Sequence, residues 1–460
     1  MIRRWAIAAA MTAAAFLLLL PGLGIGPRWL DPAMARAAGL TLFTLSGWAL
    51  VVFPEFFTAL CFYLIAMVFH VAPAGVVFSG FASVAWWMII GGLVVGIAIE
   101  RTGLGRRLAR TLFGRLSGSY TQAVAAVAVA GAGLAFLMPS TMGRVLLLLP
   151  IVLALCDRLG FGEGSRGRTG LVMTAALGTY IPSCGILPAN VPNTVMLGAV
   201  EQLYGIKLTY GPYLLRIFPV AGLGYLALLV PLVAWLYRDT AKPQDMGETP
   251  TRLTRDERVL AWILGLALLA FATDFLHGIS PAWVSLAAGV ACLAPGIAVV
   301  PAKTFSERMN LAILIYIAAI IGVGAVVADS GLGARFSAVL IEWARLEPGN
   351  GVRNLAAIFA LSVLTGVATT VIAQPAVLAP LAADMARAAD LPLMAVLMTY
   401  VVGFSVILFP YQSGPLVVAM QLGGVSTRQG MRVTLIMGAC SIAILAPLAY
   451  LWWRVLGFIG

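Results

Sequence analysis

The chain has 460 residues, of which 61% are hydrophobic and only 10% are charged. Its mean hydropathy is +1.00. Soluble domains are about one quarter charged, so a chain with so few charges cannot cover a water-facing surface. Membrane spans need about 20 apolar residues each, and apolar runs of that kind recur from end to end here. The composition excludes a soluble globular protein and predicts an all-α polytopic membrane protein.

The net charge of +11 comes almost wholly from arginine. Arginine-rich loops between apolar runs usually lie on the cytoplasmic side. We therefore interpret the net positive charge as a signal of how the chain is oriented in the membrane, not of nucleic-acid binding. The scattered cysteines and histidines show no metal-ligand spacing, so no metal, cofactor or disulfide is expected. The densest basic group, predicted to be cytoplasmic, contains Arg101, Arg106, Arg107, Arg110 and Arg115.

The amino end is basic over Met1 to Arg4 and then apolar from Trp5 to Leu20. A cleaved signal peptide has this pattern. Because no soluble domain that needs export is evident, we expect instead a retained first membrane helix and loop within residues 1–37.

A polar, charged stretch at residues 238–258 separates two long apolar regions. We interpret it as the connection between repeat 1, residues 38–237, and repeat 2, residues 259–460. Within them, Gly96–Arg107 aligns without a gap on Gly324–Arg335, with the shared core Thr/Ser-Gly-Leu-Gly-x-Arg. Internal duplication with interrupted apolar segments at matching positions indicates the binding site of a secondary transporter. Broken helices are tolerated in hydrocarbon only where they line a cavity or hold a ligand.

The first interrupted segment surrounds Pro139, Ser140 and Thr141. Proline favours a break or a first helical turn, which would place two hydroxyls beside free backbone N–H groups, an anion site in outline. The alternative is a kinked span whose hydroxyls bond back to their own helix.

Arg144 lies next on an apolar run, with no other charge between Arg115 and Asp157. An arginine inside a span costs from about 3 to more than 10 kcal/mol. It should therefore face a cavity, an acid or a bound anion, unless it snorkels to the membrane surface.

The second interrupted segment, residues 178–194, contains Pro182, Pro188, Pro192, Asn190 and Asn193. Such a sequence cannot form an unbroken span, and its amide and carbonyl groups suit a cation or an oxyanion. A plain extramembrane loop is the alternative, but no charge occurs from Thr169 to Val200.

The second half supplies neutral polar counterparts at Thr365–Pro375 and Phe409–Pro415. Polar breaks in matched pairs favour one composite site. The predicted substrate-binding residues are Ser140, Thr141, Arg144, Pro192, Asn193, Thr194, Thr369, Thr370, Gln374, Gln412 and Ser413. Cation ligands are predicted at Ser140, Gly185, Asn190 and Asn193.

In these segments the chain resembles the divalent-anion/sodium symporter family, whose members carry dicarboxylates, citrate or sulfate. Phe78–Ala82 through Arg107 is similar to the family's first re-entrant hairpin and the segment after it, and Leu276–Ala282 resembles the start of its second-half scaffold helix. Pro192-Asn193 resembles the family's Pro-Pro-Asn loop. The resemblance implies about 11 transmembrane helices plus two re-entrant hairpins, in two inverted repeats. It also implies a dimerising scaffold, including residues 38–75 and 259–305, and a moving elevator-type transport domain.

The family's Ser-Asn-Thr-Ala-Thr motifs, which form its sodium sites and carboxylate contacts, are degenerate here. Counted back from Leu149-Pro150, the first copy falls on Ser140-Thr141-Met142-Gly143-Arg144. Counted back from Pro380, the second falls on Thr370-Val371-Ile372, beside Thr369. Thioether and alkyl groups are poor ligands for a hard cation. Sodium coupling is therefore doubtful, and Arg144 would supply a fixed positive charge and a bidentate grip on a carboxylate or sulfate.

These observations predict a secondary transporter for a small anion in a bacterial inner membrane, a homodimer by resemblance, working by exchange or coupled to Na⁺ or H⁺. An anion channel or an exporter is the alternative. A membrane-embedded enzyme would need clustered acids, histidines or a nucleophile with its base, which the sequence lacks.

Overall fold

The protein is described from a computed structural model, which covers residues 2–19, 31–49, 53–105, 107, 119–240, 252–297 and 299–459. Throughout these ranges the regular elements are helices, without a strand. The predicted all-α class is thus confirmed. Arg106, Arg110 and Arg115 of the basic group, and most of the polar connection, lie outside the described residues.

The first half begins with two helices that pack on each other and continues through short, long and broken helices. In order these are α1 (Ile2–Leu19), α2 (Pro32–Ala49), α3 (Glu55–Val68), α4 (Ala74–Val77), α5 (Ser79–Ala82), α6 (Val84–Thr102), α8 (Tyr120–Leu137), α9 (Thr141–Arg158), α10 (Arg166–Tyr180), the 3₁₀ turns η2 (Pro182–Gly185) and η3 (Leu187–Ala189), α11 (Val191–Tyr204), α12 (Tyr210–Ile217), the π-helix η4 (Phe218–Gly224) and α13 (Tyr225–Leu236).

The second half is also a series of long, short and broken helices. It contains α14 (Arg255–Ala272), α15 (Asp274–His277), α16 (Pro281–Leu293), α17 (Ala302–Arg308), α18 (Leu311–Asp329), α19 (Leu332–Ala344), α20 (Gly351–Ala368), α21 (Gln374–Leu378), η5 (Ala379–Leu381), α22 (Ala382–Ala389), α23 (Leu393–Phe404), η6 (Pro410–Gln412), α24 (Gly414–Gly423), α25 (Thr427–Cys440), the π-helix η7 (Ser441–Leu445) and α26 (Ala446–Val455). In both halves the last long helix is interrupted by a π segment.

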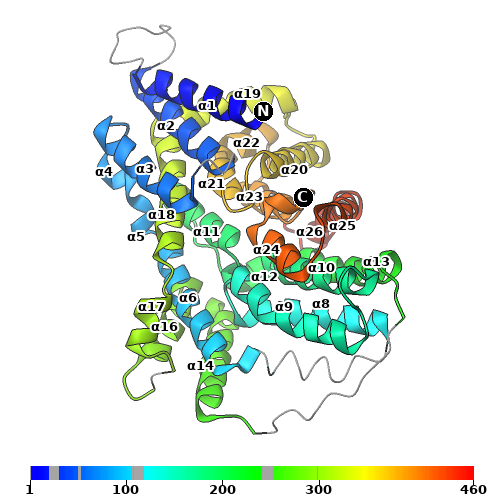
Figure 1. Cartoon of the computed structure of the whole chain (residues 1–460). Helices are drawn as coiled ribbons and strands as arrows, with labels where there is room; N and C mark the ends of the chain where they lie inside the picture. Colours follow the sequence, from blue (N-terminus) through cyan, green and yellow to red (C-terminus); the bar gives the residue numbers. More distant parts are fainter. Residues whose placement is uncertain are drawn as a thin grey trace.

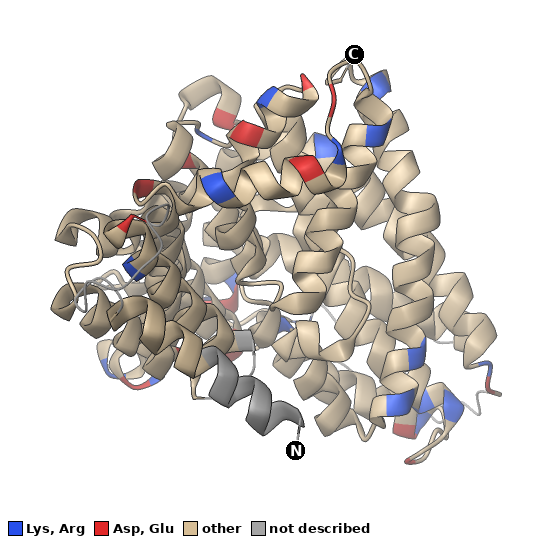
Figure 2. Ribbon diagram, turned by 90° about the horizontal axis from the view of Figure 1, so that it is seen from above, with Lys and Arg blue, Asp and Glu red and all other residues tan. Residues whose placement is uncertain are grey.

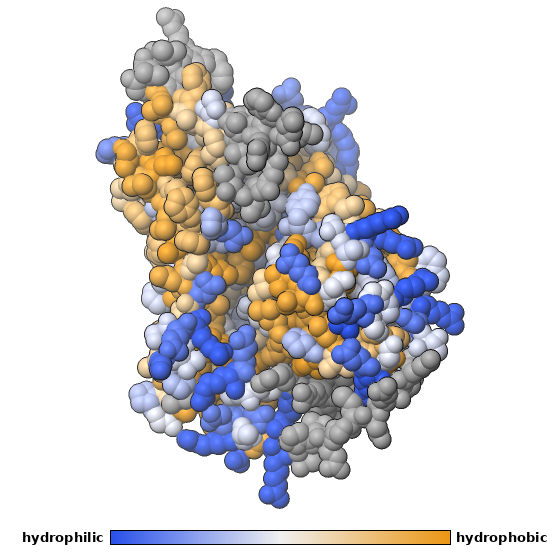
Figure 3. All heavy atoms as spheres, in the orientation of Figure 1, coloured by the Kyte–Doolittle hydropathy of each residue, from blue (hydrophilic) through white to orange (hydrophobic). Residues whose placement is uncertain are grey.

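Six described helical stretches are long and apolar enough to cross a membrane: Val84–Thr102, Tyr120–Leu137, Tyr210–Leu236, Leu311–Asp329, Gly351–Ala368 and Thr427–Val455. Shorter apolar helices accompany them, including α3, α16, α23 and α24. Trp235 and Trp262 are each 74% exposed. Extensive apolar areas reach the molecular surface (Figure 3) and charged residues lie mostly at its periphery (Figure 2), as expected of a protein whose solvent is lipid. The total of about 11 spans stays a prediction.

The helices α3, α18, α6, α16 and α14 form a column at one side of the molecule (Figure 1). Within the column, helices of the first half pack on helices of the second half: α6 packs on α16, and α3 packs on α18. Small residues allow the first contact: a Cβ on Gly91 would lie 2.2 Å from the Ser285 carbonyl oxygen. Glycines at helix crossings let backbones approach closely in membranes. The broken helices lie beside this column (Figure 1).

Candidate functional site

The first break lies between α8 and α9, where sequence predicted it. α8 ends at Leu137 and α9 begins at Thr141. Ser140 is the N-cap of α9, and its hydroxyl accepts a hydrogen bond of 3.1 Å from the Gly143 backbone N–H. Serine caps satisfy a backbone donor that would otherwise be orphaned. The half-buried Ser140 hydroxyl is thus already hydrogen-bonded to the first turn of α9.

Arg144, in the first turn of α9, is completely buried. Its Nη1 donates to the carbonyl oxygens of Met138 and, at 2.7 Å, Ala189. Its Nη2 donates to the Thr141 hydroxyl at 3.0 Å and to the Thr179 carbonyl oxygen at 3.2 Å. The side chain therefore does not snorkel to the surface, and its four Nη hydrogens are used within the first half of the chain.

The four oxygens around Arg144 form a cage without a carboxylate, since no described Asp or Glu lies within 4.0 Å of the guanidinium. Carbonyl and hydroxyl oxygens are the ligands that hard cations prefer. Here the guanidinium takes those ligands, so Na⁺ does not fit in the cage while Arg144 occupies it. Only the buried Nε lacks a partner.

The second break, residues 181–190, is buried throughout and consists of η2 and η3. The Asn193 side-chain amide donates to the carbonyl oxygens of Ser183, at 3.0 Å, and Ile186, at 2.9 Å. Asn190 caps α11 by accepting from the Asn193 backbone N–H at 3.0 Å. The two asparagines thus satisfy backbone groups that the break frees, and Asn193 Oδ1 is left without a partner.

Three other predicted residues here serve the local backbone. Pro192 and Thr194 are buried in the first turn of α11, and the Thr194 hydroxyl donates to the Asn190 carbonyl oxygen at 2.9 Å. A Cβ on Gly185 would lie 2.6 Å from Phe218 Cα, so this glycine permits close packing of η2 on η4. The predicted cation ligands Asn190, Asn193 and Gly185 therefore gather in one buried segment.

In the second half, α20 ends at Ala368 and α21 begins at Gln374. Between them Thr369 donates to the Thr365 carbonyl oxygen at 2.8 Å. The Gln374 amide nitrogen donates to the hydroxyl of Ser362 at 2.8 Å. The Val371 backbone N–H donates to the Gln412 carbonyl oxygen at 3.2 Å, which joins this break to the one after α23.

Gln412 ends η6, Ser413 directly precedes α24, and both are buried. Gln412 Oε1 accepts from the backbone N–H groups of Leu408 and Phe409, each at 2.8 Å. Four buried side-chain atoms in these segments have no partner: Thr370 Oγ1, Gln374 Oε1, Gln412 Nε2 and Ser413 Oγ. Buried polar atoms are nearly always hydrogen-bonded, so an unpartnered group of this kind marks a candidate ligand site.

Two of these atoms approach a common point beside Gly366. A Cβ placed there would lie 2.7 Å from Gln374 Oε1 and 3.3 Å from Gln412 Nε2. Packing also brings the halves together, because α11 contacts α21, while α9 and α10 contact α24. The predicted residues thus fall in two adjoining clusters, one around Arg144 and one around Gln374 and Gln412.

Sequence reasoning missed several members of the site. The carbonyl oxygens of Met138, Thr179 and Ala189 hold Arg144, but a carbonyl carries no side-chain signal. Ser362, which accepts from Gln374, lies inside an ordinary helix. Its spacing of 12 residues before Gln374 gives no periodic clue.

The fold and these two clusters define a polytopic helical membrane protein with paired helix breaks, which is the class of secondary transporters. The family model described as the sodium:sulfate symporter transmembrane region matches residues 2–459, and the chain belongs to this family. It is a multi-pass inner-membrane protein and an anion transporter.

Relatives and a solved structure agree with this assignment. The chain is 25% identical over 404 residues to an L-tartrate/succinate antiporter of Escherichia coli K12, with 82% of this chain and 80% of the relative covered. It is 24% identical over 402 residues to a membrane protein of Cupriavidus necator, covering 84% and 77%. The crystal structure of the Alcanivorax borkumensis YdaH transporter matches with a TM-score of 0.58 at 17% identity, covering 83% of this chain and 86% of that one, and so shares the fold.

Proposed function

We propose that the protein exchanges small dicarboxylates or similar oxyanions by alternating access and without sodium. The observation that carries this proposal is the buried Arg144 guanidinium, held by three carbonyl oxygens and a hydroxyl, with no carboxylate of the described residues beside it. The E. coli relative named as an L-tartrate/succinate antiporter supports both the substrate class and exchange.

The bidentate grip expected from sequence is not what this geometry offers, since both Nη atoms already bond to the protein. Arg144 instead acts through its field and its remaining Nε donor. The unpartnered Gln412 Nε2, Ser413 Oγ and Thr370 Oγ1 are suited to bond the anion's far oxygens.

A fixed internal cation also favours exchange over net uptake. A bound sodium ion can leave together with the substrate, but the Arg144 charge cannot. Moving an empty site through the bilayer would carry an unneutralised charge through a low-dielectric region, which is unfavourable. A bound anion offsets that charge, so the loaded carrier crosses more readily than the empty one.

For the moving parts, we propose that α3, α6, α14, α16 and α18 belong to a fixed scaffold that dimerises. The broken helices and their neighbours then form a transport domain, within two inverted repeats. Support comes from the contact at one edge of the column: a Cβ on Gly92 of α6 would lie 2.8 Å from Pro139 Cβ, in the first break. This contact would change as the transport domain moves.

The test is uptake of labelled succinate, L-tartrate, citrate and sulfate into liposomes containing the purified protein. With unlabelled substrate inside, the initial rate should rise at least about tenfold over empty liposomes, because the loaded return step is the favourable one. An uptake rate that does not depend on internal anion, together with a steady electrical current, would identify the alternative, a channel. Uptake driven by an imposed pH gradient without internal anion would mean proton coupling.

A further inference from the structure

The start of α12 is held by an acid from a distant part of the chain. The side chain of Thr209, the N-cap residue, makes no capping hydrogen bond. Instead the Tyr210 backbone N–H donates to the carboxylate of Asp274, the first residue of α15, which lies 64 residues further along the chain. A carboxylate at a helix N-terminus binds free N–H groups and stabilises the positive end of the helix dipole. Asp274 thus caps α12 from outside the helix.

This cap is buried but incomplete. Asp274 is 2% exposed, and no described basic side chain forms an ion pair with it. Because Pro212 has no N–H, only the N–H groups of Tyr210 and Gly211 lack a carbonyl partner within α12. Asp274 Oδ1 has no partner, although a Cβ on Gly211 would lie 3.7 Å from it. A buried oxygen without a partner is unfavourable, so this contact is weaker than a completed cap.

On one side, the contact belongs to the column that contains α14. Only Thr273 separates α15 from the end of α14. The Tyr210 ring also stacks on Phe271 of α14, with the ring centres 5.2 Å apart and an angle of 17° between the ring planes. The start of α12 therefore has one polar and one aromatic contact with the part proposed as the scaffold.

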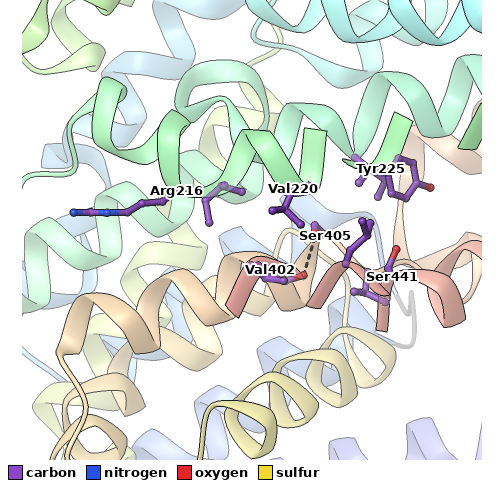
Figure 4. Close-up of a pocket in the computed structure, with 12 residues that line it drawn as sticks. Arg216, Val220, Tyr225, Val402, Ser405 and Ser441 are labelled. Atoms are coloured by element: carbon purple, nitrogen blue, oxygen red, sulfur yellow. Dashed lines mark hydrogen bonds between the residues drawn. The ribbon is translucent and has the colours of Figure 1, made fainter. Parts of the chain in front are cut away.

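On the other side, α12 and its continuation are bonded to the helices around the breaks. The Tyr213 hydroxyl donates to the Cys184 carbonyl oxygen of η2 at 2.9 Å. Further along, Val220 of η4 faces Val402 and Ser405 at the end of α23 (Figure 4). α26 also packs on α12. α12 and η4 thus belong with the broken helices, and the Asp274 cap crosses the boundary between the two bodies.

We propose that Asp274 is a releasable latch, an inference that rests on the proposed division into scaffold and transport domain. Its bond to Tyr210 holds α12 against the scaffold and breaks when the transport domain moves. Tyr213, one helical turn after Tyr210, is bonded to the second break, which also supplies Ala189 to the Arg144 cage. Opening the latch therefore frees the break that carries part of the anion site.

Crosslinking tests the release directly, in protein whose native cysteines are replaced by alanine. Because a Cβ on Gly211 would lie 3.7 Å from Asp274 Oδ1, Gly211→Cys/Asp274→Cys places two thiols within reach of a short, reducible bifunctional reagent. Crosslinking should lower anion exchange in liposomes at least about tenfold, and a reductant should restore it, since a required movement is blocked. Exchange that is equally fast with and without the crosslink would overturn the proposal, because the contact would then persist throughout the cycle.

The matched controls crosslink pairs within each body. Gly47→Cys/Thr58→Cys joins α2 to α3, and Val172→Cys/Gly423→Cys joins α10 to α24, with Cβ atoms 3.7 Å and 3.2 Å apart. Both should exchange anion within about twofold of the uncrosslinked protein. Equal slowing of all three pairs would also overturn the proposal, since release of α12 would then not be the cause.

Electron paramagnetic resonance measures the latch without transport. Spin labels at Trp235 on α13 and Leu276 on α15, which are 74% and 73% exposed, report the separation of the two bodies. Asp274→Ala should raise the population of a second distance at least about threefold. Asp274→Asn keeps an acceptor for the Tyr210 N–H and should stay near the wild type. Distances unchanged by Asp274→Ala would overturn the latch. Absence of dicarboxylate exchange in the wild type would overturn the proposed function alone, and these distances would still decide the latch.

Discussion

Arg144 Nη1 and the Ala189 carbonyl oxygen are 2.7 Å apart, and this bond joins the first turn of α9 to the end of η3. The two breaks of the first half are thus tied together by a single charged side chain. An internal cation of this kind both holds the site in shape and gives it a positive field. The two roles can be separated by substitution.

Arg144→Gln should reduce anion binding at least about tenfold, because the positive charge is lost. It should also lower the free energy of unfolding by about 1–3 kcal/mol for each carbonyl left without a donor. Arg144→Lys keeps the charge but not the forked geometry. It should bind anion better than Arg144→Gln at similar stability. Isothermal calorimetry and thermal unfolding measure the two effects, and unchanged binding in Arg144→Gln would make Arg144 purely structural.

Arg144→Thr should confer sodium dependence on a protein that we propose to work without sodium. The substitution frees the carbonyl oxygens of Met138, Thr179 and Ala189 and adds a hydroxyl beside them. Oxygen ligands suit a small cation, so Na⁺ but not K⁺ should raise the melting temperature of this variant. No such difference is expected for the wild type. Equal responses of the variant to both ions would contradict the interpretation of the cage.

Gln412→Glu tests the second cluster while keeping its backbone bonds. One carboxylate oxygen can still accept from Leu408 and Phe409, as Gln412 Oε1 does at 2.8 Å. The donor Nε2 becomes a negatively charged oxygen that repels an anion. KM for a dicarboxylate should therefore rise at least about tenfold, and the buried charge should also lower the free energy of unfolding. Gln421→Glu, at an exposed position of α24, is the control and should leave KM unchanged.

Asn193→Asp should destabilise the fold rather than change specificity. It removes both donors to Ser183 and Ile186 and places a carboxylate against their carbonyl oxygens. Leaving buried groups unpaired should cost about 2–4 kcal/mol of unfolding free energy. The exposed Asn310→Asp keeps the oxygen that caps α18 and should be nearly neutral. Equal melting temperatures for the two variants would refute the role assigned to Asn193.

Gly92→Val tests the boundary between the proposed scaffold and transport domain. The Cβ would lie 2.8 Å from Pro139 Cβ, whereas a Cβ at Gly96, one turn further along α6, meets nothing within 4 Å. Gly92→Val should slow transport at least about tenfold, and Gly96→Val should transport normally. Identical rates for both variants would argue against movement at this contact.

Much of the fold was predictable because membrane spans and their breaks have strong sequence signals. Pro139, the prolines of residues 182–192 and Pro375 interrupt apolar runs, and the structure interrupts helices there. The sequence also predicted that the polar breaks form one composite site, and the Val371–Gln412 bond joins the two breaks of the second half.

The cage around Arg144 could not be predicted, since its oxygens are mostly backbone atoms from three segments. Sequence indicated a charge in need of a partner, but not that carbonyl groups would be that partner. The π segments η4 and η7 were also missed, because no residue type marks an extra residue in a helical turn.

The most direct test of a built-in cation is the initial rate of succinate and L-tartrate uptake by wild-type protein in liposomes preloaded with unlabelled substrate. External sodium is replaced completely by potassium. The structure predicts rates that agree within about twofold in the two salts, because Arg144 already fills the oxygen cage. A fall of tenfold or more without sodium would contradict this account and would mean that other residues of the chain build a sodium site.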